Sequence, residues 1–132
     1  MGTPGVRKFH VFSEPAISTS DESVANSLVQ TNRRLVRTLQ TDSVSPRKLL
    51  EEYFPETQID LLNIDAEASD FDVLKSLDLE SLEINRWPRY LLLETKPPVG
   101  NALLIESVSY AISKGYIPQL VLPMSTILMS PY

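Results

Sequence analysis

The 132-residue sequence contains no cysteine and only one histidine, His10. The absence of cysteine excludes disulfide frameworks, thiolate metal sites and cysteine nucleophiles. A single histidine excludes a zinc site built from several imidazoles. No apolar run approaches the roughly 20 residues of a membrane-spanning helix, and the N-terminus lacks the hydrophobic region of a signal peptide. We therefore expect a cytoplasmic protein that does not bind a membrane.

Glycine is also scarce, and none of the four glycines lies between Gly5 and Gly100. Loops that cradle the phosphates of a nucleotide need glycines at fixed spacing, because their backbone N–H groups must approach the ligand closely. The sequence therefore predicts that this long stretch carries no glycine-rich nucleotide loop.

Charge is unevenly distributed around a net value of −5. Residues 51–83 contain eleven acids and one base, whereas residues 1–50 and 84–132 are slightly basic. The negative total argues against nucleic acid as a partner. Most members of the acidic block fit solvated helix faces. Acids that follow the ends of strands are candidates for a functional site instead, because ligands of α/β sheets bind there.

Strand and helix patterns alternate along a chain of one-domain length. The alternation predicts a single α/β domain over residues 1–132, with a mostly parallel sheet and an antiparallel strand pair at the C-terminal end. The expected strands are 8–12, 35–44, 59–64, 89–94, 116–122 and 125–129; the expected helices are 46–54, one opening near Ser69, and 101–114, with a weak helix in 18–34.

Several helix ends have specific signals. Ser45 and Pro46 suit the N-cap and first position of the helix over 46–54. Ser69 and Asp72 have the spacing of a capping box. Gly115 is placed to end the helix over 101–114.

Two apolar segments predict buried surfaces. The strand over 59–64 has the composition of one buried on both faces. One side of the helix over 46–54 is an apolar stripe, which predicts an inward face made of Leu49, Leu50, Tyr53 and Phe54.

Candidate functional residues follow the two most apolar strands. Asp65 and Glu67 come directly after residues 59–64, and Glu94 ends the strand over 89–94. Asp65 and Glu67 point the same way if the strand continues that far, and the following helix N-terminus favours their ionised forms. Such a pair can hold a hydroxyl, act as a general base or bind a hard metal ion. The alternative interpretation is that both acids cap the loop and the helix.

His10 is a second candidate, as a general base. A histidine between two apolar residues of a strand is more commonly half-buried or solvent-facing than catalytic. We therefore keep the role of general base as the alternative for His10.

Residues 59–75, IDLLNIDAEASDFDVLK, resemble the signature I-D-x-L-x-I-D-x-E-G-x-D-x-x-V-L-K of FkbM-type methyltransferases. Residues 87–94, WPRYLLLE, resemble the R-P-x-hydrophobic-E strand of that family. Residues 8–19, KFHVFSEPAIST, resemble the strand and loop that precede these motifs, and the helix stop around Gly115 with its closing strand pair also matches. The resemblance extends over nearly the whole chain in order.

The resemblance implies a partial, Rossmann-like class I methyltransferase that uses S-adenosylmethionine on a hydroxyl of a sugar or small metabolite. It implies catalytic roles for Asp65 and Glu67, a cofactor contact by Asp65, and acceptor contacts by His10, Thr19 and Glu94, without a metal. The glycine-rich cofactor loop of the family precedes all of these motifs, so the chain corresponds to the C-terminal part of such an enzyme. Ala68 departs from the family, which has glycine there.

Three hypotheses follow, and they leave enzymatic activity open. The first is a methyltransferase in a truncated or split chain, which needs a complementary N-terminal segment or self-associates. The second is a non-enzymatic α/β module that binds a partner through the exposed edge of the strand over 59–64. The third treats Asp65-Ala66-Glu67 as an acid pair that holds a metal, as in nucleotide-sugar transferases.

Overall fold

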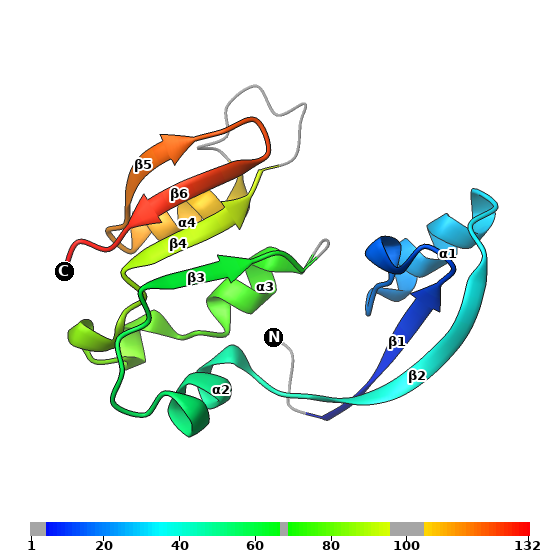
Figure 1. The fold of residues 1–132 in the computed structure, drawn as a ribbon, viewed down its shortest axis with the longest axis horizontal. Coiled ribbons are helices and arrows are strands. Elements are labelled where there is room, and N and C mark those ends of the chain that lie inside the picture. The colour runs from blue at the N-terminus through cyan, green and yellow to red at the C-terminus, as the bar shows by residue number, and fades with distance from the viewer. Residues whose placement is uncertain (1–4, 67–68, 96–104) are drawn as a thin grey trace.

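The computed structural model describes residues 5–66, 69–95 and 105–132. The chain forms an N-terminal arm (residues 5–43) and a body (residues 46–132), which Figure 1 shows side by side. The arm consists of β1 (Gly5–Phe12), the 3-10 turn η1 (Pro15–Ile17), α1 (Glu22–Gln30) and β2 (Leu35–Ser43). The body consists of α2 (Pro46–Tyr53), β3 (Leu61–Ile64), α3 (Asp70–Lys75), the 3-10 turns η2 (Leu79–Ser81) and η3 (Ile84–Arg86), β4 (Tyr90–Glu94), α4 (Glu106–Ser113), β5 (Ile117–Val121) and β6 (Ser125–Met129).

The arm is a long antiparallel hairpin capped by a helix. β1 pairs with β2 from Gly5 opposite Ser43 to Phe12 opposite Leu35. The expected weak helix in 18–34 is α1, which Asp21 caps by accepting a hydrogen bond from the Val24 N–H at 2.9 Å. The described hydrogen bonds of residues 5–43 all stay within that range, so the arm holds its own shape.

The sheet of the body has the order β3-β4-β6-β5. β3 and β4 are parallel, whereas β6 runs antiparallel to both β4 and β5. The α/β class and the antiparallel pair at the C-terminal end are confirmed, but the prediction of a mostly parallel sheet is wrong because the four-stranded sheet is mixed. The reason is the tight turn at residues 122–124, closed by the Leu122 N–H to Ser125 carbonyl bond at 2.8 Å, which sends β6 back between β5 and β4.

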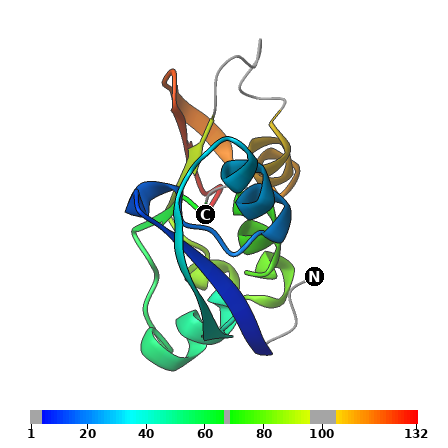
Figure 2. The ribbon, with the colours of Figure 1, turned by 90° about the vertical axis from the view of Figure 1, so that its right-hand side faces the viewer.

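Both helices that follow β3 and β4 cover the same face of the sheet. Figure 2 shows α3 and α4 together on one side of the strands. Connections between parallel strands are right-handed. When successive parallel strands follow one another in one direction across a sheet, such connections place their helices on the same face. The core lies between these layers, and its fully buried members from strands and helices include Leu74, Leu91, Leu93, Val108, Ala111 and Leu128.

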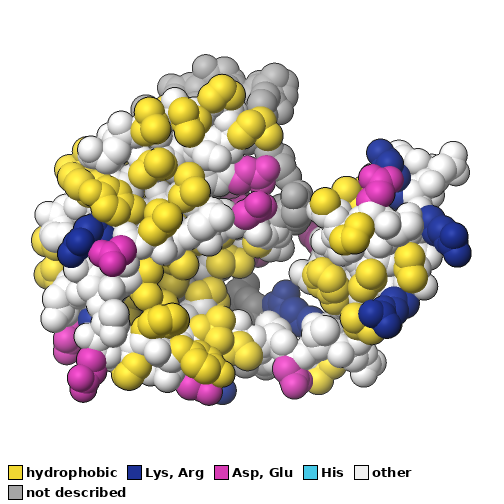
Figure 3. Space-filling view, in the orientation of Figure 1, with side chains coloured by type: hydrophobic (Ala, Val, Ile, Leu, Met, Phe, Trp, Pro, Cys, Tyr) yellow, Lys and Arg dark blue, Asp and Glu magenta, His cyan; other side chains and the backbone are white. Residues whose placement is uncertain are grey.

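The other face of the sheet has no helix over it among the described residues. Figure 3 looks onto this face and shows many hydrophobic side chains at its surface. β3 is the edge strand, and Leu61 is 54% exposed while Ile64 is buried. The prediction that this strand is buried on both faces is therefore wrong, because among the described residues no strand pairs with its outer edge and no helix covers this face.

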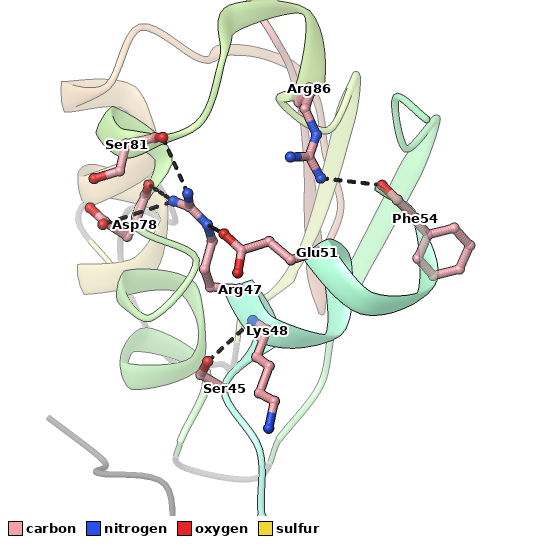
Figure 4. A network of polar contacts seen from close by, with 8 residues as sticks. All are labelled: Ser45, Arg47, Lys48, Glu51, Phe54, Asp78, Ser81 and Arg86. Carbon is pink, nitrogen blue, oxygen red and sulfur yellow. Dashed lines mark hydrogen bonds and ion pairs between the residues drawn. The ribbon is translucent and has the colours of Figure 1, made fainter. Parts of the chain in front are cut away.

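Helix α2 begins as its sequence predicts. The Ser45 side chain accepts a hydrogen bond from the Lys48 N–H at 3.2 Å (Figure 4). Pro46 is the first helical residue. The predicted inward stripe is wrong in extent: only Leu50 is buried, while the other three members, Leu49, Tyr53 and Phe54, are exposed. Apolar burial therefore holds α2 only at one point.

Polar contacts supply the rest of the attachment of α2 (Figure 4). The Arg47 guanidinium pairs with Glu51 at 2.5 Å and donates to the carbonyl oxygens of Asp78 and Ser81, each at 3.2 Å. Arg86 donates to the Phe54 carbonyl at 3.2 Å. These bonds join both ends of α2 to the segment between α3 and β4.

The closing strands pack around Tyr116. Gly115 ends α4 with a φ of +100°, which confirms the predicted helix stop because glycine adopts this region without strain. Tyr116 stacks on Trp87 with ring centroids 5.8 Å apart, and its hydroxyl donates to the Pro88 carbonyl at 2.8 Å. Burial raises the pKa of the Tyr116 phenol.

We expect Tyr116 to make the chain sensitive to alkali. The unfolded chain releases this proton above about pH 10, while the folded chain retains it, so the free energy of unfolding falls as pH rises further. Urea unfolding between pH 7 and pH 11 measures the decline. Tyr116→Phe should remove part of it, at a cost of about 1 kcal/mol at pH 7 because the Pro88 carbonyl loses its donor. Tyr53→Phe is the matched control at an exposed position; equal pH profiles for the two variants would contradict the assignment.

Candidate functional site

A cleft of about 420 Å³ lies between the arm and the body. Figure 3 shows the hollow between the two parts, and Figure 1 places the arm beyond the carboxyl ends of β3 and β4. The lining residues come from β1, from the loop after η1, from the connection between β2 and α2, and from the end of β3 with α3: Arg7, Phe9, Ser18, Thr19, Ser20, Ser43, Val44, Ser45, Pro46, Asp65, Ala66, Ser69, Asp72, Val73 and Ser76.

Seven of the fifteen residues that line this cleft carry a hydroxyl group. Six serines and Thr19 line it, together with one base, Arg7, and two acids, Asp65 and Asp72. Hydroxyls both donate and accept hydrogen bonds, and carboxylates accept them strongly. The lining is therefore suited to a polar ligand that carries several hydroxyl groups.

Three carboxylates meet where β3 and β4 end. One oxygen from each of Asp65, Asp70 and Glu94 lies within 4.8 Å of the others. The parallel register, with Ile64 beside Leu93, carries Asp65 and Glu94 to the same edge of the sheet. Oxygens in this arrangement can accept hydrogen bonds from a hydroxyl or hold a hard cation. The structure thus brings together two predicted site residues from separate strands.

Asp70 is the member that sequence reasoning missed. Its Oδ1 accepts a hydrogen bond from the Ala66 N–H at 3.0 Å, which fixes the start of the loop after β3. The predicted capping box of Ser69 and Asp72 is wrong, because Ser69 has φ −110° and ψ 5° and its side chain makes no cap hydrogen bond. Asp70 instead ties the loop to α3. The spacing of an acid five residues after Asp65 is a weak signal by itself.

The other predicted site residues are placed as follows. Thr19 lines the cleft, and its Oγ1 accepts a hydrogen bond from the Asp21 N–H at 3.0 Å. Glu67, with Ala68, lies outside the described residues. His10 is bridged to Thr19 through the backbone, with the His10 N–H to Thr19 carbonyl bond at 2.8 Å.

The His10 ring lies inside the arm and not among the residues that line the cleft. It is 8% exposed, and its Nδ1 is 3.2 Å from Thr38 Oγ1. In the part of the chain that the structure describes, the buried Nε2 has no hydrogen-bond partner. Of the three residues predicted to contact an acceptor, Thr19 is therefore the one on the cleft wall, Glu94 lies in the carboxylate group and His10 is enclosed by the arm.

No protein-family model, curated protein or solved structure matches this chain. Among the described residues, no helix is both long and apolar enough to cross a membrane. What the site can do follows from its own residues and their geometry.

We expect the Asp70 contact to be visible in stability. Asp70→Ala removes the acceptor of the Ala66 N–H and should lower the free energy of unfolding by about 1 kcal/mol. Asp70→Asn keeps an acceptor oxygen and relieves repulsion from the neighbouring carboxylates, so it should match or exceed the wild-type stability. Urea unfolding of the three proteins at neutral pH is the measurement. Equal losses in both variants would mean that the charge, and not the hydrogen bond, holds the loop.

Proposed function

We propose that the chain is the acceptor-side part of an S-adenosylmethionine-dependent O-methyltransferase that acts on a hydroxyl of a sugar or small metabolite. One observation carries the proposal. The two segments that resemble the acidic motifs of FkbM-type methyltransferases form neighbouring parallel strands, and their terminal acids, Asp65 and Glu94, meet at one edge of the sheet. Ligands of α/β sheets bind at that edge.

Two further features support this proposal. The sheet closes with an antiparallel strand pair, as the resemblance implies. The cleft that Asp65 shares with Thr19 has walls rich in hydroxyl groups, which match an acceptor that carries hydroxyls.

The role we assign to Asp65 is that of orienting group and base. Its carboxylate accepts a hydrogen bond from the acceptor hydroxyl and takes the proton as the hydroxyl oxygen becomes a nucleophile. Glu94 has a carboxylate oxygen within 4.8 Å of one of Asp65, close enough to contact the same acceptor. Thr19 contacts the same acceptor from the arm side of the cleft.

The described cleft does not by itself fit the cofactor. The family holds S-adenosylmethionine against a glycine-rich loop, whereas none of the residues that line this cleft is glycine. A side chain on every lining residue prevents the close backbone approach that such a loop provides. The proposal therefore includes a complementary segment that carries the cofactor loop, and we assign no step of the reaction to the cofactor within this chain.

The open edge of β3 favours a second candidate, a non-enzymatic binding module. An edge strand presents unpaired N–H and C=O groups that can pair with a strand of another polypeptide. Here β3 has β4 on one side, and no described strand pairs with its other side. In this alternative the carboxylates of Asp65 and Asp70 only shape the loop.

The isolated chain should bind S-adenosylmethionine weakly or not at all, because the glycine-rich loop is not among residues 6–99. Isothermal titration calorimetry measures this directly. Low-micromolar binding, on the order of −8 kcal/mol, would show that the chain holds the cofactor without that loop.

Activity should appear when the cofactor half is supplied. We would fuse the N-terminal half of an FkbM-type methyltransferase to residues 5–132 and follow transfer of labelled methyl groups to a panel of sugars. Asp65→Asn should lower turnover by roughly 10²–10⁴-fold because it removes the base. Asp72→Asn is the control, since Asp72 lines the same cleft but is not one of the three grouped carboxylates.

Equal turnover for Asp65→Asn and the parent fusion would reduce Asp65 to a structural role. A fusion that binds the cofactor yet transfers no methyl group to any hydroxyl would contradict the proposed function. Ala68→Gly, which restores the residue of the family, should leave turnover unchanged or raise it.

A further inference from the structure

Arg7 is the only base among the residues that line the cleft. Its backbone is fixed by pairing with Thr41 of β2, whose hydroxyl donates to the Arg7 carbonyl at 3.4 Å. Among the described residues, the Arg7 side chain has neither an ion-pair nor a hydrogen-bond partner, whereas Arg33, Arg47 and Arg89 each pair with an acid. The N–H groups of the Arg7 guanidinium are therefore left for a ligand that enters the cleft.

The charges of the cleft are separated between its two walls. The arm contributes Arg7 and otherwise only uncharged residues to the lining, while both acids of the lining, Asp65 and Asp72, belong to the body. In the described parts of the chain, no ion pair joins Arg7 to either acid. A ligand that spans the cleft must then offer a hydrogen-bond acceptor to Arg7 and a donor to Asp65.

An anionic group is the acceptor that suits Arg7 best. The planar guanidinium binds a carboxylate or a phosphate through two parallel hydrogen bonds, which are stronger than bonds between neutral groups. The body wall disfavours an anion, because Asp65 and Asp72 repel it. The negative group of the ligand therefore lies at the arm, and its hydroxyl groups lie towards Asp65.

Phe9 and the size of the cleft fit a ligand built on a sugar ring. Phe9 follows Arg7 by two positions in β1, so their side chains lie on the same face of the hairpin, and both line the cleft. The half-buried Phe9 ring offers apolar surface beside the guanidinium, against which the C–H groups of a sugar can pack. The cleft volume of about 420 Å³ lies within the range of small-molecule pockets, roughly 300–1,000 Å³.

We propose that the cleft binds an acidic sugar, whose carboxylate or phosphate group pairs with Arg7 while one of its hydroxyls contacts Asp65. This inference rests on the proposed function, in that the acidic sugar is the acceptor of the methyl group. Arg7 then selects an acidic acceptor over a neutral one and takes no part in the transfer itself. Because the selection is a property of binding, it is measurable without the cofactor half.

The test compares the binding of glucuronate, glucose-6-phosphate and glucose to the full chain, by NMR titration of the isotope-labelled protein. The wild-type chain should bind at least one of the two anionic sugars about tenfold more tightly than glucose, because only these sugars form charge-assisted bonds with Arg7. The anionic sugar with the higher affinity identifies the carboxylate or the phosphate as the group that Arg7 binds.

Two variants assign the preference to Arg7. Arg7→Gln keeps a hydrogen-bonding side chain but removes the charge, so it should reduce the affinity for the anionic sugars to that for glucose. Arg34→Gln is the matched control, because Arg34 is also exposed on the arm but does not line the cleft, and it should keep the preference. Both positions are exposed, so both variants should keep the fold, which their amide spectra verify.

A wild-type chain that binds the three sugars equally, or binds none of them, overturns the inference. So does a preference for the anionic sugars that survives Arg7→Gln or is lost in Arg34→Gln. The proposed function fails by a different result, which is the absence of methyl transfer in the fusion protein. The two failures are therefore distinguishable.

Discussion

The Arg47 guanidinium is the contact on which the arrangement of the rest of the chain depends. Helix α2 buries a single apolar side chain, Leu50, so hydrophobic packing holds it weakly. Arg47 compensates by donating to two carbonyl groups of the segment before β4 while it pairs with Glu51. Hydrogen bonds from a charged donor contribute about 1.5–3 kcal/mol each. They fix α2 against the body, and through it the point from which the arm departs.

Local signals account for the parts of the fold that were predicted well. Ser45 with Pro46 and the glycine at 115 act through their own backbone preferences, so their effect does not depend on distant residues. The strand order depends on pairing between distant segments. The sequence of residues 125–129 does not indicate that this strand lies between β4 and β5. The sheet is mixed because the strand takes that position.

The candidate site also has members that the sequence could predict and a member that it could not. Asp65 and Glu94 were predictable as strand-end acids, because parallel neighbours bring their carboxyl ends to a common edge. Asp70 joins them only through the path of the loop after β3, which the sequence pattern does not determine. His10 was a candidate from the sequence, but its ring is not among the residues that line the cleft. Its partner Thr38 is set by the register of the hairpin, and that register encloses the ring within the arm.

The hydrogen bonding of the arm has a mechanical consequence. Residues 5–43 bond among themselves, and Ser45 is held extended at φ −70° and ψ 144° as the cap of α2 and the residue before proline. No described hydrogen bond joins residues 5–43 to residues 46–132. The covalent connection through Val44 and Ser45 therefore sets the direction in which the hairpin leaves the body, and with it the wall of the cleft that faces Asp65.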